Sequence, residues 1–450
     1  MKKLSAVIIF LTGLYALSSF ASPKVSPNIV HEKVLKNGLK ILVKEDRRAP
    51  VMVSQLWYKV GASYEHGGIT GLSHVLEHMM FQGTHGTLPG EFSKIIAENG
   101  GRENAFTGAD YTAYFQVMEA SRLEVSLKLE ADRMQNLKFQ QKEFAKELQV
   151  VMEERRMRTE DKPQGQTYEY FKALAYTNSP YRNPIIGWMQ DLEDMELADL
   201  ADWYKRWYSP NNATLVVVGD VNAKNVFVLA EQYFGGIPTV NFKPVKNRTE
   251  VPQVGIRRAV VKQKAKVPYL LMGYKVPVLN SVEDDADIYA LEVLSGILSG
   301  GSSARLASRL VRGSQVATSA SAGYDMNARL PTLFLFDAVP VKGTTVKSLE
   351  NALLEQLKLL KEHPVEKKEL DRIKAQVIAS SVYEKDSNFY QAMQLGMLNT
   401  VGVGWQKGEA YVEKVKAITA EQIQAVASRY LIEDHLTVVH MQVEEMQGAH

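Results

Sequence analysis

Two histidines and a glutamate lie close together in the first quarter of the chain, where residues 74–78 read His-Val-Leu-Glu-His. On a helix, His74 and His78 are four residues apart, so both imidazoles can reach a single metal ion. Glu77 lies beside them, where its carboxylate can take a proton from a metal-bound water. The order H-x-x-E-H, the inverse of the commoner H-E-x-x-H motif, predicts a zinc hydrolase. The alternative is a helix that carries two histidines and a glutamate on its surface without any metal.

The apolar residues around the motif predict how this helix is placed. At about 100° per residue, one stripe of the helix is apolar and the three motif side chains cluster on the opposite side. The stripe consists of Leu72, Val75, Leu76, Met79 and Met80. A helix that packs this stripe on a core would present the two imidazoles and the carboxylate to a shared cleft.

The third metal ligand must come from elsewhere in the sequence. A catalytic zinc site has three protein ligands and an open position for water, and the chain has no cysteine. A predicted helix at 141–158 offers Glu147 and Glu154, which are seven residues apart and therefore nearly superposed at the border of its apolar face. Glu154 can then be a ligand, with Glu147 behind it. His66 and His85 are weaker candidates, and the two glutamates could instead belong to a solvated helix.

Composition indicates a globular chain with more than one domain. The chain has 450 residues, 45% of them apolar, and a formal net charge of +2. This length and apolar content are sufficient for two domains with their own cores. The small net charge and the lack of a basic patch argue against a nucleic-acid partner.

Residues 1–21 have the features of a secretory signal peptide. Two lysines precede an uncharged run from Leu4 to Phe20, and Ser19 and Ala21 are small residues of the kind that signal peptidase requires. We therefore expect cleavage after Ala21, export to a bacterial periplasm and a mature chain without a membrane span. The alternative is a membrane anchor, for which the apolar run is short.

A weak internal repeat divides the chain into two similar parts. Tyr58-Lys59-Val60 ends one strand-like segment, and Tyr274-Lys275-Val276 ends a similar one in the second half. A repeat this long indicates duplicated domains, and strands and helices are grouped in a way that favours the α+β class. The predicted division is an N-terminal domain at 29–240, a linker at 241–255 and a C-terminal domain at 256–450. The first domain is expected to contain strands at 39–45, 51–60 and 213–219 and helices at 120–137 and 141–158.

The repeat also confines the metal to the first domain. When the two halves are aligned on these segments, the second half has Ala290, Val293 and Leu294 in place of the three motif residues. These apolar residues predict a core helix without ligands. We therefore expect one zinc ion per chain, bound in the N-terminal domain.

Together these segments resemble the pitrilysin/insulysin family of metallopeptidases, in the branch of mitochondrial processing peptidase and its short bacterial relatives. The resemblance rests on H-x-x-E-H with Glu154 well downstream of His78, on Lys36-Asn37-Gly38-Leu39 before the first strand, and on Asn104-Ala105-Phe106-Thr107. It implies two homologous mixed-sheet-plus-helices domains that form half of a clamshell chamber.

The resemblance implies a zinc-dependent endopeptidase that hydrolyses short or unfolded peptides. His74, His78 and Glu154 would bind zinc. Glu77 would be the general base, and Glu147 would support the site. The peptide substrate would pair with an edge strand formed by Asn104, Ala105, Phe106 and Thr107. The alternative is a catalytically silent scaffold or binding subunit of the same family, although such chains usually lack motif residues that are all present here.

One departure from the family pattern concerns the partner. Active single-chamber members have an Arg and a Tyr, seven residues apart, that follow a Gly-rich turn and bind the substrate backbone. This chain has the turn at 300–306, but an ungapped alignment places Val311 and Thr318 at the two positions. The resemblance therefore implies a heterodimer with a related chain that carries the Arg/Tyr pair. A homodimer is the alternative, with Arg312 or Tyr324 in that role.

Overall fold

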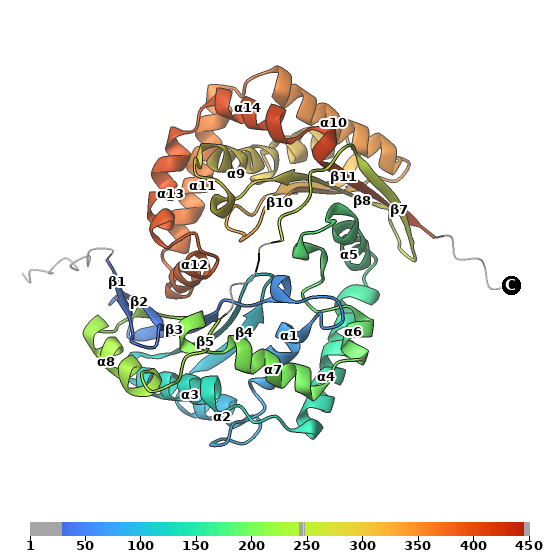
Figure 1. The fold of residues 1–450 in the computed structure, drawn as a ribbon. Helices are drawn as coiled ribbons and strands as arrows, with labels where there is room; N and C mark the ends of the chain where they lie inside the picture. Colours follow the sequence, from blue (N-terminus) through green and yellow to red (C-terminus); the bar gives the residue numbers. More distant parts are fainter. Residues whose placement is uncertain (1–28, 243–245, 247, 445–450) are drawn as a thin grey trace, which may run out of the picture.

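Two mixed sheets, each with its own helices, form the two halves of the molecule (Figure 1). The computed structural model describes residues 29–242, 246 and 248–444. The arrangement confirms the predicted α+β class with two similar halves. The predicted signal peptide at 1–21 lies outside the described residues, as do parts of the predicted linker and residues 445–450. The division at 240 and 256 stays a prediction.

The first sheet contains the strand on which the substrate was expected to pair. Its strands are β1 (Val30–Val34), β2 (Lys40–Glu45), β3 (Val51–Tyr58), β4 (Arg102–Thr107), β5 (Thr112–Glu119) and β6 (Ala213–Gly219). They are arranged in the order β1-β2-β6-β3-β5-β4, with β2 and β6 parallel and the other neighbours antiparallel. The central strands β3 and β6 are buried along almost their whole length, as their apolar and β-branched residues predict. β4 lies at the edge and is partly exposed.

The second sheet repeats this topology. Its strands are β7 (Arg257–Gln263), β8 (Tyr269–Val276), β9 (Ala317–Gly323), β10 (Thr332–Pro340) and β11 (Leu436–Val443). Their order is β7-β11-β8-β10-β9, again with one parallel pair, β7 and β11. β8 therefore corresponds to β3, and the edge strand β9 corresponds to β4. The matching orders confirm the internal repeat predicted from the sequence.

Helices cover the sheets in both halves (Figure 1). The first half contains α1 (Leu72–Met79), α2 (Glu91–Glu98), α3 (Leu123–Gln135), α4 (Gln141–Arg155), α5 (Pro163–Ala175), α6 (Met189–Glu193), α7 (Leu197–Trp207) and α8 (Ala223–Phe234). The second half contains α9 (Ala286–Ser299), α10 (Val346–Glu362), α11 (Lys367–Glu384), α12 (Asn388–Thr400), α13 (Gln406–Ala417) and α14 (Ala420–Tyr430).

Two of these helices cross from one half to the other (Figure 1). α5 packs on β7, β8 and β11 of the second sheet, and α12 packs on β3 and β6 of the first sheet. A glycine allows the close approach at each contact. A Cβ on Gly273 of β8 would lie 2.8 Å from Phe171 of α5, and a Cβ on Gly396 of α12 would lie 2.1 Å from the indole nitrogen of Trp57 in β3. Each half therefore supplies a layer of the other half's core.

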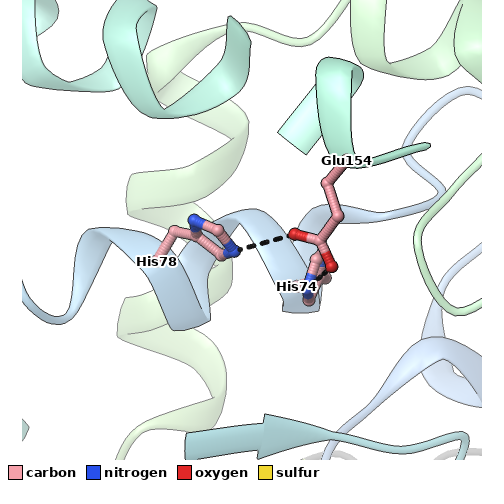
Figure 2. Close-up of side chains that lie close together, drawn as sticks. All are labelled: His74, His78 and Glu154. Atoms are coloured by element: carbon pink, nitrogen blue, oxygen red, sulfur yellow. Dashed lines mark ion pairs between the residues drawn. The ribbon is translucent and has the colours of Figure 1, made fainter. Parts of the chain in front are cut away.

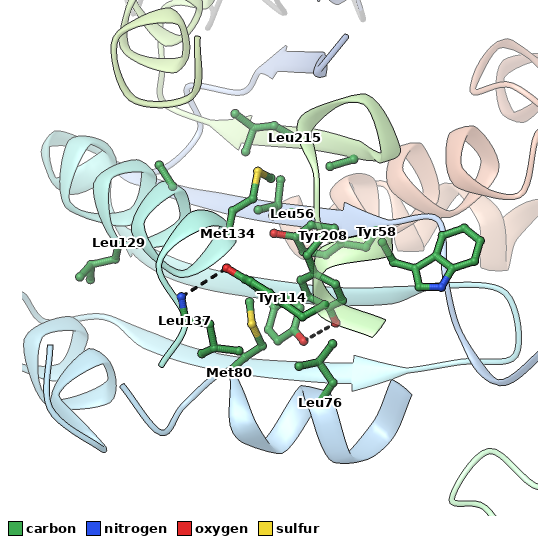
Figure 3. Packing of buried hydrophobic residues seen from close by; sticks show 14 of the residues in the cluster. Leu56, Tyr58, Leu76, Met80, Tyr114, Leu129, Met134, Leu137, Tyr208 and Leu215 are labelled. Carbon is green, nitrogen blue, oxygen red and sulfur yellow. Dashed lines mark hydrogen bonds between the residues drawn. The ribbon is translucent and has the colours of Figure 1, made fainter. Parts of the chain in front are cut away.

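The core of the first half lies between its sheet and several helices, among them α1 and α3 (Figure 3). Leu76 and Met80 pack there with Leu56 and Tyr114. The hydroxyl groups of Tyr114 and Tyr208 are hydrogen-bonded at 2.8 Å, so these buried phenols satisfy each other. The whole predicted apolar stripe of α1 is buried, which fixes the face that the motif helix turns away from the core.

Candidate metal centre

The motif helix α1 is held at its beginning as well as along its apolar face. The first backbone N–H groups of a helix have no partner within it. Here the Glu65 carboxylate accepts from the N–H of Gly71 at 2.8 Å and from the N–H of Ser73 at 2.7 Å. Burial raises the pKa of Glu65 to about 7, against these hydrogen bonds, which lower it. The cap therefore fixes the start of the helix just before the first histidine.

Glu154, at the end of α4, points towards the two imidazoles of α1 (Figure 2). Its Oε2 is 3.6 Å from Nε2 of His78, and its Oε1 is 3.9 Å from Nε2 of His74. These separations are too long for hydrogen bonds. Ligands that share a tetrahedral zinc ion at about 2.0–2.2 Å lie about 3.4 Å apart, so the spacing fits a metal between the groups.

The donor set also fits a metal. One donor atom from each of the three residues lies within 4.8 Å of the other two. Two imidazoles and a carboxylate, with a fourth position left for water, are a common set for catalytic zinc. In the described part of the chain, His74, His78 and Glu154 thus form a group able to hold a metal ion.

The two histidines differ in their electrostatic surroundings. Burial lowers the pKa of His74 to about 3, and the positive charges of His78 and Arg158 act in the same direction. His74 is therefore neutral near pH 7, which is the form that binds a metal. Burial also lowers the pKa of His78, but the hydrogen bond to Glu147 and the nearby carboxylates outweigh it, so the net shift is upward.

Glu147 lies behind the metal-binding group and orients one ligand. Nδ1 of His78 is 3.2 Å from Oε2 of Glu147, and Nε2 of Gln82 donates to Oε1 of Glu147 at 2.9 Å. The hydrogen bond to His78 lowers the pKa of Glu147, which keeps the carboxylate ionised. A proton held on Nδ1 by this acceptor leaves the lone pair of Nε2 directed towards Glu154.

Glu77 lies next to the histidines and is held by the edge strand. The hydroxyl of Thr107 in β4 donates to Oε2 of Glu77 at 2.5 Å. Burial raises the pKa of Glu77, against the hydrogen bond from Thr107. A raised pKa makes a carboxylate a better proton acceptor, which is the property that a general base requires.

The three metal donors and Glu77 open into one cavity of about 660 Å³, whereas Glu147 does not line it. Residues 104–107 of β4 line it together with the three metal donors and Glu77. Another part of the lining comes from α5, with Gly165, Tyr168, Glu169 and Lys172. The cavity therefore brings the predicted metal, base and substrate residues together, whereas neither His66 nor His85 lines it.

Comparison with known proteins places the chain in a family. Residues 40–188 match the model described as insulinase (peptidase family M16), and residues 194–377 match the peptidase M16 inactive domain. The zinc protease PqqE of Helicobacter pylori is 34% identical over 390 residues, which are 86% of this chain and 85% of that protein. The chain belongs to peptidase family M16. Membership confirms the resemblance to the pitrilysin/insulysin metallopeptidases and, with it, the class of a peptide-bond hydrolase.

Solved structures share the fold of this M16 chain. A protease from Helicobacter pylori superposes with a TM-score of 0.87 at 32% identity, over 92% of this chain and 100% of that one. The periplasmic protease PqqL of Escherichia coli superposes with a TM-score of 0.76 at 19% identity, over 92% of this chain but 47% of PqqL. The M16 chain thus has the fold of one half of PqqL, as the predicted half-chamber requires.

Three contacts of this M16 site were not predicted from the sequence. Arg158, in the π-helical segment Arg156–Glu160 that continues α4, forms an ion pair with the Glu154 carboxylate. The i, i+4 spacing within the predicted helix was a signal that could have revealed it. The cap by Glu65 and the hydrogen bond between Thr107 and Glu77 depend on how separate segments meet. No local pattern marks such contacts.

The second half of the M16 chain lacks these ligands at the matching positions. Ala290, Val293 and Leu294 are fully buried within α9. Their burial confirms the prediction that this helix is a core helix and leaves the described His-His-Glu group in the first half.

Proposed function

We propose that this chain is a zinc-dependent endopeptidase that hydrolyses short or unfolded peptides. One zinc ion would be held by His74, His78 and Glu154. The observation that carries the proposal is that three metal donors, a carboxylate base and a free strand edge face one cavity. Membership of a peptidase family supports the same chemistry.

The residues around the metal donors have separable roles in the proposed reaction. When bound, zinc supplies a Lewis acid that lowers the pKa of a water molecule and polarises the scissile carbonyl. Glu77 accepts the proton of the attacking water and passes it to the leaving amine. Thr107 holds Glu77 beside β4, while Glu147 holds His78 in the tautomer whose Nε2 is free to bind.

The edge strand β4 is the proposed binding site for the peptide backbone. β4 lies at the end of its sheet and pairs with β5, so in the described part of the chain no strand covers its outer edge. The N–H of Ala105 donates to Oδ1 of Asn104 at 2.9 Å, a contact that an added strand would replace. Asn104, Ala105, Phe106 and Thr107 also line the metal cavity. A peptide added as a further strand gains backbone hydrogen bonds with little demand on its sequence. Extended substrates, which are short or unfolded chains, fit this mode.

The missing Arg/Tyr pair supports a partner chain. Neither Arg312 nor Tyr324 lines the metal cavity, and the Tyr324 hydroxyl donates to the backbone oxygen of Pro277 at 2.6 Å. The proposed enzyme is therefore a heterodimer whose other chain supplies the pair, with a homodimer as the alternative. PqqL, of which this chain spans 47%, is an example of a longer chain with room for a second such unit.

The proposed location is the periplasm, reached through the predicted signal peptide at 1–21. PqqL, a protein of the same fold, is a periplasmic protease. In the part of the chain that the structure describes, no helix is long and apolar enough to cross a bilayer.

The variant Glu77→Gln tests the proposed function, because it removes the base and leaves the metal donors in place. We expect one zinc per chain in both proteins and a fall in cleavage of a quenched fluorescent peptide by about 10²- to 10⁴-fold in the variant. Zinc content and steady-state rates are measured on protein isolated from its native source, so that any partner is retained. A chelator should abolish the wild-type rate, and added zinc should restore it.

Glu153→Gln is the matched control, since Glu153 precedes Glu154 on α4, is exposed and loses the same charge. It should cleave at the wild-type rate. Wild-type protein that binds no zinc, or Glu77→Gln protein with full activity, would contradict the proposal. A silent binding subunit would take up zinc and peptide without cleavage in every variant.

A further inference from the structure

Lys172, on α5, is a cation in the metal cavity that has no counter-ion among the described residues. Its side chain lines the cavity together with that of Tyr168, one helical turn earlier. The Lys172 ammonium lies 5.9 Å from the centroid of the Tyr168 ring. Among the described residues, no hydrogen bond or ion pair joins this ammonium to another group. A lysine is seldom buried without such a partner, and Lys172 is partly buried.

The carboxylates whose charge reaches Lys172 are bound to other cations. Glu169 accepts two hydrogen bonds from Arg155, at 2.8 and 2.9 Å. Asp110 accepts from Nε of Arg329 at 3.0 Å. Both acids are therefore satisfied by an arginine, and neither needs the lysine.

Burial lowers the pKa of the Lys172 ammonium because it removes part of its hydration. The pKa of Lys172 falls to about 8, although the charges of Asp110 and Glu169 act in the opposite direction. The group is still mainly protonated at pH 7. A charge that has lost part of its hydration and gained no counter-ion is in an unfavourable state, and a ligand carboxylate would relieve it.

The cavity as a whole also favours an anionic ligand. Its charged lining consists of Glu77, Glu154, Glu169, Arg158, Lys172 and Arg182. Glu169 is already neutralised by Arg155, which lies outside the lining. Positive groups therefore exceed negative groups even before a divalent cation is added, and such a cavity attracts negative charge.

The corresponding position in the second half shows that the fold does not require a lysine here. When α5 and α12 are aligned at Phe171 and Gly396, where each helix meets the opposite sheet, Met397 takes the place of Lys172. Met397 lines a cavity of about 510 Å³ in the second half. Tyr390, Met393 and Gln394 of α12 line that cavity at the positions that match Gly165, Tyr168 and Glu169. An uncharged side chain thus fits at the same position of the helix, so packing alone does not explain why Lys172 carries a charge there.

We propose that Lys172 anchors a carboxylate of the substrate, so that the best substrates carry a carboxylate at a fixed distance from the cleaved bond. This inference rests on the proposed peptidase function and adds a substrate class to it. The carboxylate belongs either to an Asp or Glu side chain or to the C-terminus of a short peptide. Both sources present the same anion for a charge-assisted hydrogen bond. A peptide paired with β4 lies in the same cavity as the ammonium.

Matched pairs of peptides test the inference and separate the two sources. One series moves a single Asp through the positions that flank the cleaved bond, each peptide with an Asn counterpart. A second pair differs only in a free or amidated C-terminus. We expect the wild type to prefer one carboxylate peptide by about 10- to 100-fold in kcat/KM, mainly through KM. The pair that shows the preference identifies the source of the carboxylate.

Variants at Lys172 connect the preference to the side chain. Lys172→Met, which copies Met397, is expected to bring the carboxylate peptide down to the level of its neutral counterpart. Lys172→Arg keeps the charge and should retain most of the preference. Lys162→Met removes an exposed lysine next to the start of α5 that does not line the cavity, and it should match the wild type. Thermal unfolding verifies that each variant is folded.

Two results would overturn the inference while leaving the peptidase function intact. One is equal cleavage of both members of every pair by the wild type, and the other is a preference that persists in Lys172→Met. If no peptide is cleaved at all, the peptidase function fails instead. The inference is then decided by calorimetric binding of the same pairs to Glu77→Gln protein, where equal affinities for both members overturn it.

Discussion

The two halves of the chain form cavities at corresponding places and put different chemistry into them. The first cavity holds two imidazoles and their neighbouring carboxylates. The second lies among α9, α11, α12 and α13 and is lined mainly by tyrosines, methionines and acidic side chains. At the α9 positions that match His74 and His78, the second half has Ala290 and Leu294, which are buried. The duplicated fold forms a cavity in each half, and a few side chains determine whether that cavity can bind a metal.

The two exchanged helices show a second kind of difference. Trp57 and Gly273 occupy equivalent places on β3 and β8, and Phe171 and Gly396 occupy equivalent places on α5 and α12. On the first sheet, the strand contributes the ring and the helix the glycine, whereas on the second sheet these roles are reversed. Each contact contains one ring and one glycine, so the volume is matched although the residues have changed places.

The largest effect is expected when the metal residues of the first half are replaced by those of the second. His74→Ala combined with His78→Leu copies positions 290 and 294. Since Glu154 cannot hold the ion alone, we expect loss of bound zinc and of all metal-dependent cleavage. Zinc per chain and peptide cleavage are the measurements. His66→Ala changes an exposed histidine outside the cavity and should have no effect, and zinc retained by the double variant would break the comparison.

A methyl group added at each of the two helix contacts should lower the free energy of unfolding by different amounts. Gly396→Ala places a Cβ 2.1 Å from the Trp57 indole nitrogen, and Gly273→Ala places one 2.8 Å from the Phe171 ring. We expect Gly396→Ala to lower the free energy of unfolding by about 1–3 kcal/mol, even though alanine favours helix. Gly273→Ala should cost less because its contact is longer.

Urea denaturation measures both of these losses. Gly236→Ala is the control, since no atom lies within 4 Å of its added Cβ, and it should change stability by less than about 0.5 kcal/mol. Equal losses in all three variants would mean that the helix contacts are not the cause.

The smallest effect is expected at Glu250, which ties the segment between the halves to both of them. Its carboxylate accepts from the backbone N–H groups of residues 177–179 and, at 2.7 Å, from Nζ of Lys275 in β8. Burial alone would raise the pKa of Glu250, but these hydrogen bonds outweigh it and hold the pKa at about 2. Because the folded-state pKa lies below the ordinary value of 4.5, the stabilisation is present above pH 4.5 and is lost as the pH falls towards 2.

Glu250→Gln should therefore lower the free energy of unfolding by about 1 kcal/mol at pH 7. The difference from the wild type should shrink as the pH is lowered below 4.5. Urea denaturation across this pH range gives the measurement, with Glu283→Gln, an exposed glutamate, as the control. A difference that stays constant with pH would show that the charge of Glu250 is not responsible.

Those parts of the site that lie within one element could be predicted from the sequence. The spacing of His74 and His78 and the seven-residue spacing of Glu147 and Glu154 are helical properties, and both pairs lie as expected. The strand at 213–219 also has its predicted bounds. In these cases the periodicity of the chain alone determines which side chains share a face.

The exchange of α5 and α12 could not be predicted in the same way. An apolar residue such as Phe171 indicates that one face of its helix is buried, but not which sheet buries it. That choice depends on Gly273, which lies far along the chain in the second half. Lys172 lies on the same crossing helix, so its position in the metal cavity could not be predicted either.

The crossing of these two helices means that the halves are not separable modules. A single cleavage of the chain between the halves would leave two fragments that stay associated, because each has a helix packed on the sheet of the other. Either fragment produced alone would have one sheet face that no helix covers and one helix without the sheet on which it packs. The half that carries the metal donors therefore depends for its packing on a half that has no donors at the matching positions.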